Sequence, residues 1–273
     1  MEEFATQNLK QLYVPDSGSH KGQNGKVMII AGSILFHAAS LWPLTVASRI
    51  VDMVFYSSVD ENNEIVKKNK EEFKNGIIVP RNKIEEYIND ADCILIGPGL
   101  PREEGVENGD DDTKNLTQTL LQKYPNKKWV VDGGSLQVIT PSVLPKTAII
   151  TPHKKEFETL FQISPTFENA IEMAKKYSIT ILLKGEEDIV ADSTRSVIIK
   201  GGNAGMTKGG TGDVLAGLTA SLYSKNDAFL SASCASYINK KAGESLEKKM
   251  GIYFNASDLA SEIPLTINDL LTS

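Results

Sequence analysis

The chain has few cysteines, no block of basic residues and no long apolar segment. Its two cysteines, Cys93 and Cys234, lie far apart in apolar stretches, so we expect two buried thiols rather than a disulfide or metal site. No apolar run approaches the roughly 20 residues of a membrane span. The N-terminus, MEEFATQNLK, lacks the basic and apolar regions of a secretory signal. We therefore expect a cytoplasmic protein with no membrane partner.

The charge balance is mildly acidic. The formal net charge is −6 and Lys and Arg are dispersed, which argues against nucleic acid as the main partner. A local pocket can still be positive and bind an anionic small molecule. Hydrophobic residues make up 41% of the 273 residues, enough for a proper core, and we find no repeat or linker. We expect a single domain over residues 1–273.

Short β-branched runs alternate with helix-like segments along most of the chain. The runs are continuously apolar, which is typical of a parallel sheet with helices on both faces. Two further runs, Asp188–Ala191 and Ser196–Lys200, flank a turn and predict an antiparallel hairpin at the sheet edge. The predicted parallel strands are Lys26–Ala31, Met53–Ser57, Cys93–Ile96, Trp129–Val131, Ala148–Ile150 and Ile179–Leu183.

Four of these strands end in residues that can do chemistry. Cys93–Ile96 is followed by Gly-Pro-Gly, and the next three strands are followed by Asp132, by Thr-Pro-His153 and by Lys184. In open α/β sheets, ligands bind beyond the carboxyl ends of the strands. We therefore expect these strand ends to meet in one site. The acidic stretch of residues 103–112 we interpret instead as a solvated surface loop, in preference to a metal site.

The stretch KGGTGDVLAG, residues 208–217, places three glycines around Thr211 and a lone aspartate at the start of a predicted helix, Thr211 to about Ser224. Glycines before a helix let backbone N–H groups converge on a phosphate, and the helix N-terminus adds positive potential. It is not a Walker A loop, because the lysine precedes the glycines. Asp213 beside a phosphate suits a base that deprotonates an attacking hydroxyl. The alternative is that Asp213 only caps the helix.

Residues 203–217 resemble the signature of the ADP/ATP-dependent NAD(P)H-hydrate dehydratases, a branch of the ribokinase-like superfamily. The resemblance extends over nearly the whole chain, in order. It implies a three-layer α/β sandwich with a mostly parallel central sheet, helices on both faces and an antiparallel edge hairpin. The further matching segments are His20–Gly22 with Gly25, Ala31–Ser33, Ile96–Leu100, Asp132–Leu136, Thr151–Glu156 (TPHKKE for the family's TPHPGE), Leu183–Gly185 and Ala256–Leu259.

The resemblance implies a repair reaction. The family phosphorylates the 6-hydroxyl of hydrated NADH or NADPH with ADP or ATP, then eliminates phosphate to restore the dihydronicotinamide. We expect ADP as the donor, with Mg²⁺ bound to it, and we assign no residue as a metal ligand. We also expect a homo-oligomer, for which a tetramer is one candidate. The family's fused epimerase domain is expected to be absent.

The resemblance also assigns residues. Asp213 matches the catalytic base, and Gly210, Thr211 and Gly212 match the anion hole. Ala39, Gly99 and His153, with Asp213, match positions that contact the hydrated dinucleotide. The nucleotide-binding set is Lys184, Gly185, Glu186, Glu187, Asp188, Asn203, Lys208, Gly209, Gly210, Thr211 and Gly212.

Several assignments stay open. Thr151 can cap a helix with Pro152 in its first turn, and Glu156 can help to cap it or take part in function. Asp132 either orients the site or holds a magnesium–water cluster. Two departures from the family pattern, His37 and Asn239, are expected on the dinucleotide side or in oligomer packing. The competing functions are a ribokinase-like kinase of a hydroxymethylpyrimidine or hydroxyethylthiazole, and a nucleotide-binding protein without catalysis.

Overall fold

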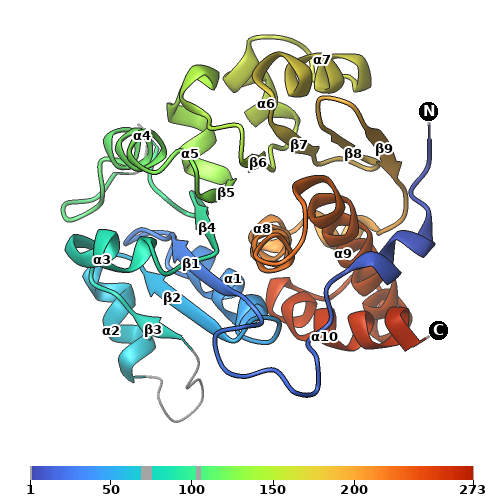
Figure 1. The fold of residues 1–273 in the computed structure, drawn as a ribbon, viewed down its shortest axis with the longest axis horizontal. Coiled ribbons are helices and arrows are strands. Elements are labelled where there is room, and N and C mark those ends of the chain that lie inside the picture. Colours follow the sequence, from blue (N-terminus) through green and yellow to red (C-terminus); the bar gives the residue numbers. More distant parts are fainter. Residues whose placement is uncertain (1, 69–75, 103–105, 273) are drawn as a thin grey trace.

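One nine-stranded sheet organises the molecule. In this computed structural model, which describes residues 2–68, 76–102 and 106–272, the strand order is β3-β2-β1-β4-β5-β6-β7-β8-β9 (Figure 1). All pairs from β3 to β7 are parallel, and β7–β8–β9 pair antiparallel. The strands are β1 Lys26–Ile30, β2 Met53–Ser57, β3 Ile77–Ile78, β4 Cys93–Ile96, β5 Lys128–Val131, β6 Ala148–Ile150, β7 Thr180–Leu183, β8 Asp188–Ala191 and β9 Ser196–Ile199.

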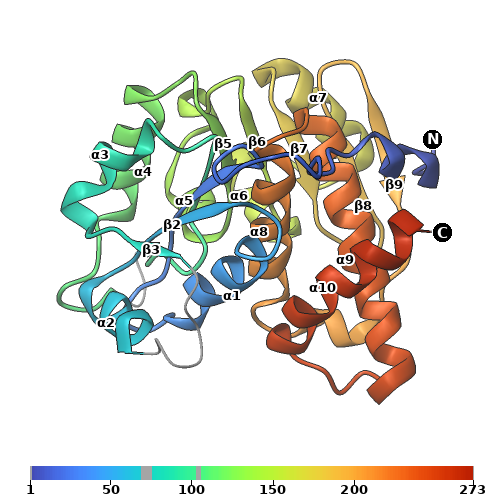
Figure 2. The same cartoon turned by 60° about the horizontal axis from the view of Figure 1, so that its bottom comes forward.

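Helices cover both faces of the sheet, as Figures 1 and 2 show. The four helices α1, α8, α9 and α10 pack against one another on one face, and α3 to α7 lie on the other. The α-helices are α1 Ala38–Ala47, α2 Asp60–Lys68, α3 Ile84–Ile88, α4 Thr113–Lys123, α5 Gly133–Val138, α6 Lys154–Phe161, α7 Phe167–Tyr177, α8 Thr211–Tyr223, α9 Ala228–Met250 and α10 Ala256–Thr272. The 3₁₀ turns are Thr6–Gln11, Arg81–Lys83, Pro141–Val143 and Ala204–Thr207.

Alternate residues of each strand feed two separate cores. In β1, Val27 and Ile29 join the core under α1 and α8, whereas Met28 and Ile30 join the core under α3 to α7. All four side chains are fully buried. A strand buried on both faces must be apolar at every position, which explains why the continuous apolar runs located the strands.

The predicted strands and the edge hairpin are confirmed to within one residue at each end. The two-residue strand β3 was not predicted, although it lies in the short apolar run of residues 77–79. The edge strand β9 is covered by the N-terminal segment: Phe4 N–H donates to the Ile198 carbonyl, and Ile198 N–H donates to the Glu2 carbonyl. This pairing satisfies backbone groups that a bare edge would leave open.

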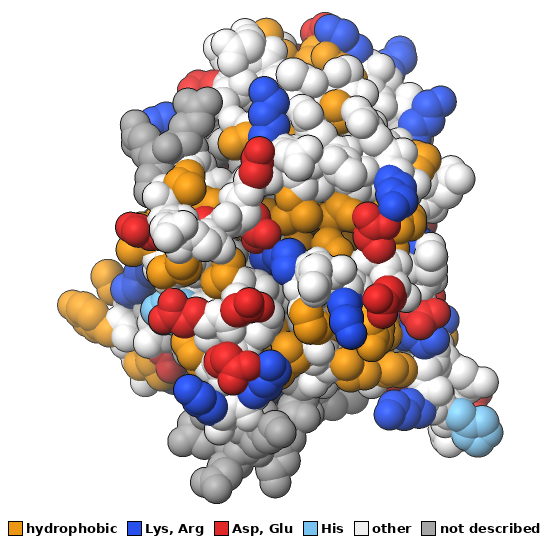
Figure 3. Space-filling view, turned by 90° about the vertical axis from the view of Figure 1, so that its left-hand side faces the viewer, with side chains coloured by type: hydrophobic (Ala, Val, Ile, Leu, Met, Phe, Trp, Pro, Cys, Tyr) orange, Lys and Arg blue, Asp and Glu red, His pale blue; other side chains and the backbone are white. Residues whose placement is uncertain are grey.

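The surface fits the sequence expectations in part. Both cysteines are buried and free. Acidic and basic side chains alternate over the face in Figure 3, without a block of one sign. The expected solvated loop holds for the exposed residues 106–109; Glu103 to Gly105 lie outside the described residues. Asp110 and Asp111, however, are half-buried, and Asp111 pairs with Arg81 at 2.8 Å. No described helix is both long enough and apolar enough to cross a membrane.

Candidate active site

The carboxyl ends of β4 and β5 lie against each other. Gly97, directly after β4, has φ +119°, and a Cβ there would lie 1.8 Å from the carbonyl oxygen of Asp132. Only glycine allows this close approach of two backbones. The Gly97 carbonyl in turn accepts a hydrogen bond from Gly134 N–H at 3.0 Å. The contact fixes Asp132 at the start of α5, facing the ends of the neighbouring strands.

A buried ion pair occupies the middle of this edge. The Lys184 Nζ atom, just after β7, lies 2.9 Å from Asp132 Oδ1 and 4.0 Å from Glu156 Oε2. Thr151, just after β6, donates its hydroxyl to the same Asp132 oxygen at 2.7 Å. Both carboxylates are almost fully buried. The predicted meeting of the strand ends is therefore confirmed, and Asp132 forms an ion pair with Lys184.

Charge and burial shift the pKa values of this group. The pKa of Asp213 is raised to about 8, mainly by burial; nearby Asp132 and Glu156 also raise it, and Lys184 opposes them. Burial likewise raises the pKa of Glu156. Burial alone would lower the pKa of Lys184, but the carboxylates of Asp132 and Glu156 raise it above its usual value. Lys184 thus stays charged among three acidic side chains, one of which titrates near neutral pH.

Asp213 lies in the first turn of α8, whose N-cap is Gly210. Gly210 has φ +94°, and a Cβ on it would lie 2.3 Å from the Trp42 ring, so packing as well as backbone conformation requires glycine here. A Cβ on Gly212 would lie 3.3 Å from Lys184 Nζ, whereas Gly209 has open space around it. The first-turn N–H groups of a helix have no partner within the helix. They are available to an anion beside Lys184.

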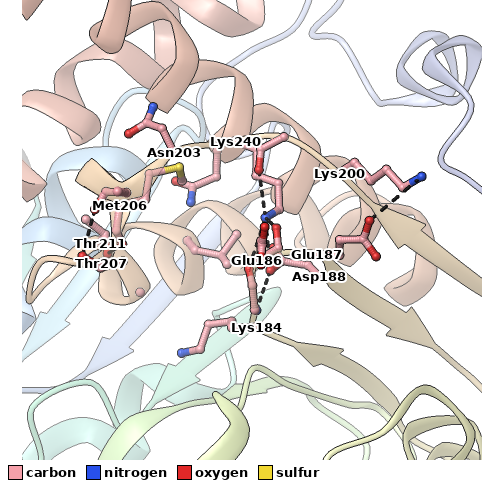
Figure 4. Close-up of a pocket in the computed structure, with 17 residues that line it drawn as sticks. Lys184, Glu186, Glu187, Asp188, Lys200, Asn203, Met206, Thr207, Thr211 and Lys240 are labelled. Atoms are coloured by element: carbon pink, nitrogen blue, oxygen red, sulfur yellow. Dashed lines mark hydrogen bonds and ion pairs between the residues drawn. The ribbon is translucent and has the colours of Figure 1, made fainter. Parts of the chain in front are cut away.

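A pocket of about 660 Å³ opens beside this helix start (Figure 4). We call it the donor pocket. Its walls come from the turn after β7, from the loop after β9, and from α8 and α9. The lining residues are Lys184, Gly185, Glu186, Glu187, Asp188, Lys200, Gly201, Gly202, Asn203, Ala204, Met206, Thr207, Thr211, Gly212, Leu215, Asn239 and Lys240.

Eight of the eleven positions expected to bind nucleotide line the donor pocket; Lys208, Gly209 and Gly210 do not. Lys208 is turned elsewhere, since its Nζ donates to the Ile252 carbonyl. Asn203 braces the wall: its amide donates to the Gly243 carbonyl at 2.8 Å and accepts from Gly205 N–H at 2.9 Å. The Thr211 hydroxyl is likewise engaged internally, donating to the Met206 carbonyl at 2.7 Å.

The inner wall of the donor pocket is a polar face of α9 that sequence reasoning missed. Lys240 is 5% exposed; its Nζ donates to the carbonyls of Glu186 at 2.8 Å and of Gly185 and Gly201 at 3.3 Å. It also pairs with buried Asp188 at 3.5 Å. Polar or small residues spaced three and four apart, at positions 236, 239, 240 and 243, were the pattern that could have revealed this face.

The expected place of Asn239 is wrong. It was expected on the dinucleotide side or in oligomer packing, but it is 4% exposed and lines the donor pocket. Within the described chain its Oδ1 has no hydrogen-bond partner. The reason is helical geometry: Asn239 lies three residues after Ser236, which bonds Asp188, and four before Gly243, which packs on Met206, so it shares the face of α9 beside the donor pocket. The other departure, His37, is exposed before α1.

The expected helix cap at Thr151 is also wrong. The N-cap of α6 is His153: its Nδ1 accepts from Glu156 N–H at 3.1 Å, and Glu156 Oε2 accepts from His153 N–H at 2.8 Å. Thr151 and Pro152 lie before the helix, because the Pro152 carbonyl is taken by Lys184 N–H from the neighbouring strand end. Glu156 therefore caps α6, and its Oε2 also lies 4.0 Å from Lys184 Nζ.

Ala39 and Gly99, both expected to contact substrate, lie against each other. A Cβ on Gly99 would lie 2.5 Å from the Ala39 Cβ and 2.9 Å from the Phe36 carbonyl. The start of α1 thus packs directly on the turn after β4. Neither Ala39 nor Gly99 lines the donor pocket, whereas His153 forms a β-bridge with Lys184 and Asp213 follows Gly212 directly. In the described ranges, no cluster of three or more His, Cys, Asp or Glu side chains forms a ready metal site.

A three-layer α/β fold with a carboxylate at a glycine-rich helix start, beside a pocket and a buried lysine, defines a nucleotide-dependent enzyme of the ribokinase-like class. Residues 27–265 match the family model described as NAD(P)H-hydrate dehydratase. The chain belongs to the NAD(P)H-hydrate dehydratase family.

Individual relatives agree. Over 94% of its length the chain is 33% identical to the ADP-dependent (S)-NAD(P)H-hydrate dehydratase of Nitrosopumilus maritimus, covering 94% of that protein. It is 39% identical to the bifunctional NAD(P)H-hydrate repair enzyme of Methanocaldococcus jannaschii over 94% of its own length, but spans about half of that relative (51%). The crystal structure of the Bacillus subtilis ADP/ATP-dependent NAD(P)H-hydrate dehydratase co-crystallised with ATP and Mg²⁺ superposes with a TM-score of 0.81 at 22% identity, covering 98% of each chain. The expected fold class is confirmed.

Proposed function

We propose that the protein dehydrates hydrated NADH and NADPH with ADP as phosphoryl donor. One observation carries the proposal: Asp213, with a pKa near 8, lies at the start of α8 beside the buried Lys184–Asp132 pair and the donor pocket. Support for the substrate comes from family membership and from relatives named as ADP-dependent dehydratases. A carboxyl group with a pKa near the working pH is suited to accepting a proton in the transition state.

The reaction can be assigned to named groups. Asp213 takes the proton of the 6-hydroxyl as that oxygen attacks the terminal phosphorus of ADP, and AMP leaves with the electrons of the broken P–O bond. The N–H groups at the start of α8 and the Lys184 ammonium stabilise the transferred group. The phosphate then departs with the C6–O electron pair, and loss of a proton from the adjacent ring carbon restores the double bond.

Mg²⁺ belongs to this proposal as a companion of the nucleotide. Mg²⁺ in proteins is usually held by substrate phosphates and one or two carboxylates, with waters completing its shell. This chemistry fits a site that has carboxylates but no ready cluster of three ligands among the residues described. Asp132 and Asp213 are the carboxylates that would hold it, and the ion would neutralise charge on the phosphates.

Four expectations remain proposals about the whole protein. One domain over residues 1–273 is supported by the single sheet and its two cores. A cytoplasmic location is supported by the two buried free cysteines. A homo-oligomer is supported by exposed large apolar side chains such as Phe36 and Tyr253. The positions assigned to nucleotide and substrate are supported by the donor pocket and by the separate place of Ala39 and Gly99.

The test is recovery of dihydronicotinamide absorbance from hydrated NADH and NADPH, with ADP and with ATP in separate reactions. We expect recovery that depends on nucleotide and is faster with ADP. Phosphorylation of a hydroxymethylpyrimidine or hydroxyethylthiazole without any recovery of absorbance would replace the proposal with the kinase alternative. Nucleotide binding without turnover of either substrate would indicate a nucleotide-binding protein without catalytic activity.

A further inference from the structure

A second pocket, of about 320 Å³, lies beside the first turns of α6, and we call it the α6 pocket. It shares no lining residue with the donor pocket. Its walls come from the connection after β4, from α5 and from α6. The lining residues are Arg102, Gln137, Val138, His153, Lys155, Glu156 and Thr159.

Two cationic side chains line the α6 pocket without a partner. Arg102 and Lys155 are exposed, and neither forms an ion pair with any residue in the described part of the chain. They come from different elements, so their charges converge only in the folded molecule. His153, half exposed at the same wall, is engaged through both ring nitrogens with Glu156.

The acidic side chain in the lining is already engaged. Glu156 Oε1 accepts from the Gln137 amide at 3.2 Å and lies 3.4 Å from His153 Nε2, while Oε2 accepts from His153 N–H. Glu156 is 3% exposed, so it offers little surface to a ligand. The groups left for a ligand are therefore the Arg102 guanidinium and the Lys155 ammonium, a pair suited to phosphate oxygens.

The α6 pocket adjoins the reacting centre. Glu156 links the two, since its Oε2 lies 4.0 Å from Lys184 Nζ, the group that neighbours Asp213. His153, expected to contact the hydrated dinucleotide, forms part of its wall. When the nicotinamide of a dinucleotide lies at Asp213, its phosphates lie several bonds away from the reacting carbon. The α6 pocket offers positive charge to one of these phosphates.

We propose that the α6 pocket binds a phosphate group of the hydrated dinucleotide through Arg102 and Lys155. This inference rests on the proposed function. The pyrophosphate is common to both dinucleotides, whereas the 2′-phosphate is present only in hydrated NADPH. The two phosphates share the chemistry that the pocket recognises, and comparing the two substrates separates them.

The experiment measures KM and kcat for hydrated NADH and hydrated NADPH in Lys155→Gln, Arg102→Gln and the double variant. We expect the double variant to raise KM about tenfold, the scale of losing charge-assisted hydrogen bonds, with kcat and ADP affinity nearly unchanged. A rise for both substrates assigns the pyrophosphate, and a rise for NADPH-hydrate alone assigns the 2′-phosphate. Lys175→Gln removes the same charge from an exposed position on α7 and should change neither KM.

An unchanged KM for both substrates in the double variant overturns the inference while the proposed function stands. Calorimetry with NADP⁺ and NAD⁺ gives a readout that does not require turnover. If the wild type repairs neither hydrate, the proposed function fails, yet weaker NADP⁺ binding by the double variant still supports a phosphate subsite. Equal NADP⁺ affinity in the wild type and the double variant overturns the phosphate subsite.

Discussion

The donor pocket and the α6 pocket differ in what their walls are made of. The donor pocket includes buried Lys240, with three carbonyl contacts, and half-buried Asn203, both hydrogen-bonded to backbone carbonyls. The α6 pocket is lined by exposed side chains such as Arg102 and Lys155. A buried network is rigid and fails as a unit, whereas exposed side chains act one by one. Changes on the donor side should therefore affect stability and binding together, and changes on the α6 side should affect substrate affinity alone.

The largest predicted effect is a loss of turnover on substitution of Asp213. Asp213→Asn keeps the shape of the helix start but cannot accept a proton, so turnover should fall by at least about two orders of magnitude. Nucleotide affinity measured by calorimetry should stay close to wild type. Turnover within a few-fold of wild type would show that Asp213 is a cap and not the base.

The second effect tests the rigidity of the donor side. Lys240→Met removes the ammonium that holds three carbonyls and leaves Asp188 buried without its cation. Breaking a buried pair in this way costs about 3 kcal/mol, so we expect a lower free energy of unfolding and weaker ADP binding. The matched control is Lys241→Met, one residue along α9, where the lysine is 34% exposed and pairs with Glu244. Loss of ADP affinity without loss of stability would mean that Lys240 contacts the nucleotide itself.

The third effect is a pH dependence set by Asp213. Its pKa in the folded protein, about 8, lies above the ordinary value of 3.8, so the folded state holds this proton more tightly than the unfolded state. Stability should therefore decrease as pH rises from about 4 to 8, while kcat/KM increases as the base ionises. Lys184→Met removes a charge that lowers this pKa, so the midpoint of the rate profile should move to higher pH. A rate profile that is flat from pH 6 to 9 would contradict the assignment.

The smallest effect is expected on the α6 side. His153→Ala should raise KM for the hydrated dinucleotide a few-fold and leave ADP affinity nearly constant, because residues that touch one ligand shift mainly that ligand. Loss of its cap on α6 should cost about 1 kcal/mol of stability. His153→Asn, which can still cap, separates the two roles: it should restore stability but not KM. Equal weakening of both ligands would show that the two sides are coupled.

The sequence by itself determined the strands, the edge hairpin and the start of α8. Strands such as β4, buried on both faces, must be apolar at every position, and this local property is visible in the chain. The glycine-rich stretch before Asp213 was equally visible, because a helix that starts without Cβ obstruction needs those residues in sequence order. The strand ends at Asp132 and Lys184 also followed from the sequence, since parallel strands bring their carboxyl ends to one edge.

The tertiary structure alone decided which of these residues touch and what lines the pockets. Lys184, expected in the nucleotide-binding set, lines the donor pocket, and its ammonium also pairs with Asp132, 52 residues earlier in the chain. Asn239 and Lys240 line the donor pocket because α9 packs against the β7–β8 turn, where Lys240 donates to the Glu186 carbonyl. Charges as far apart in sequence as Arg102 and Lys155 meet at one pocket through the order of the strands. Such contacts depend on how helices and strands pack, which no local pattern of residues encodes.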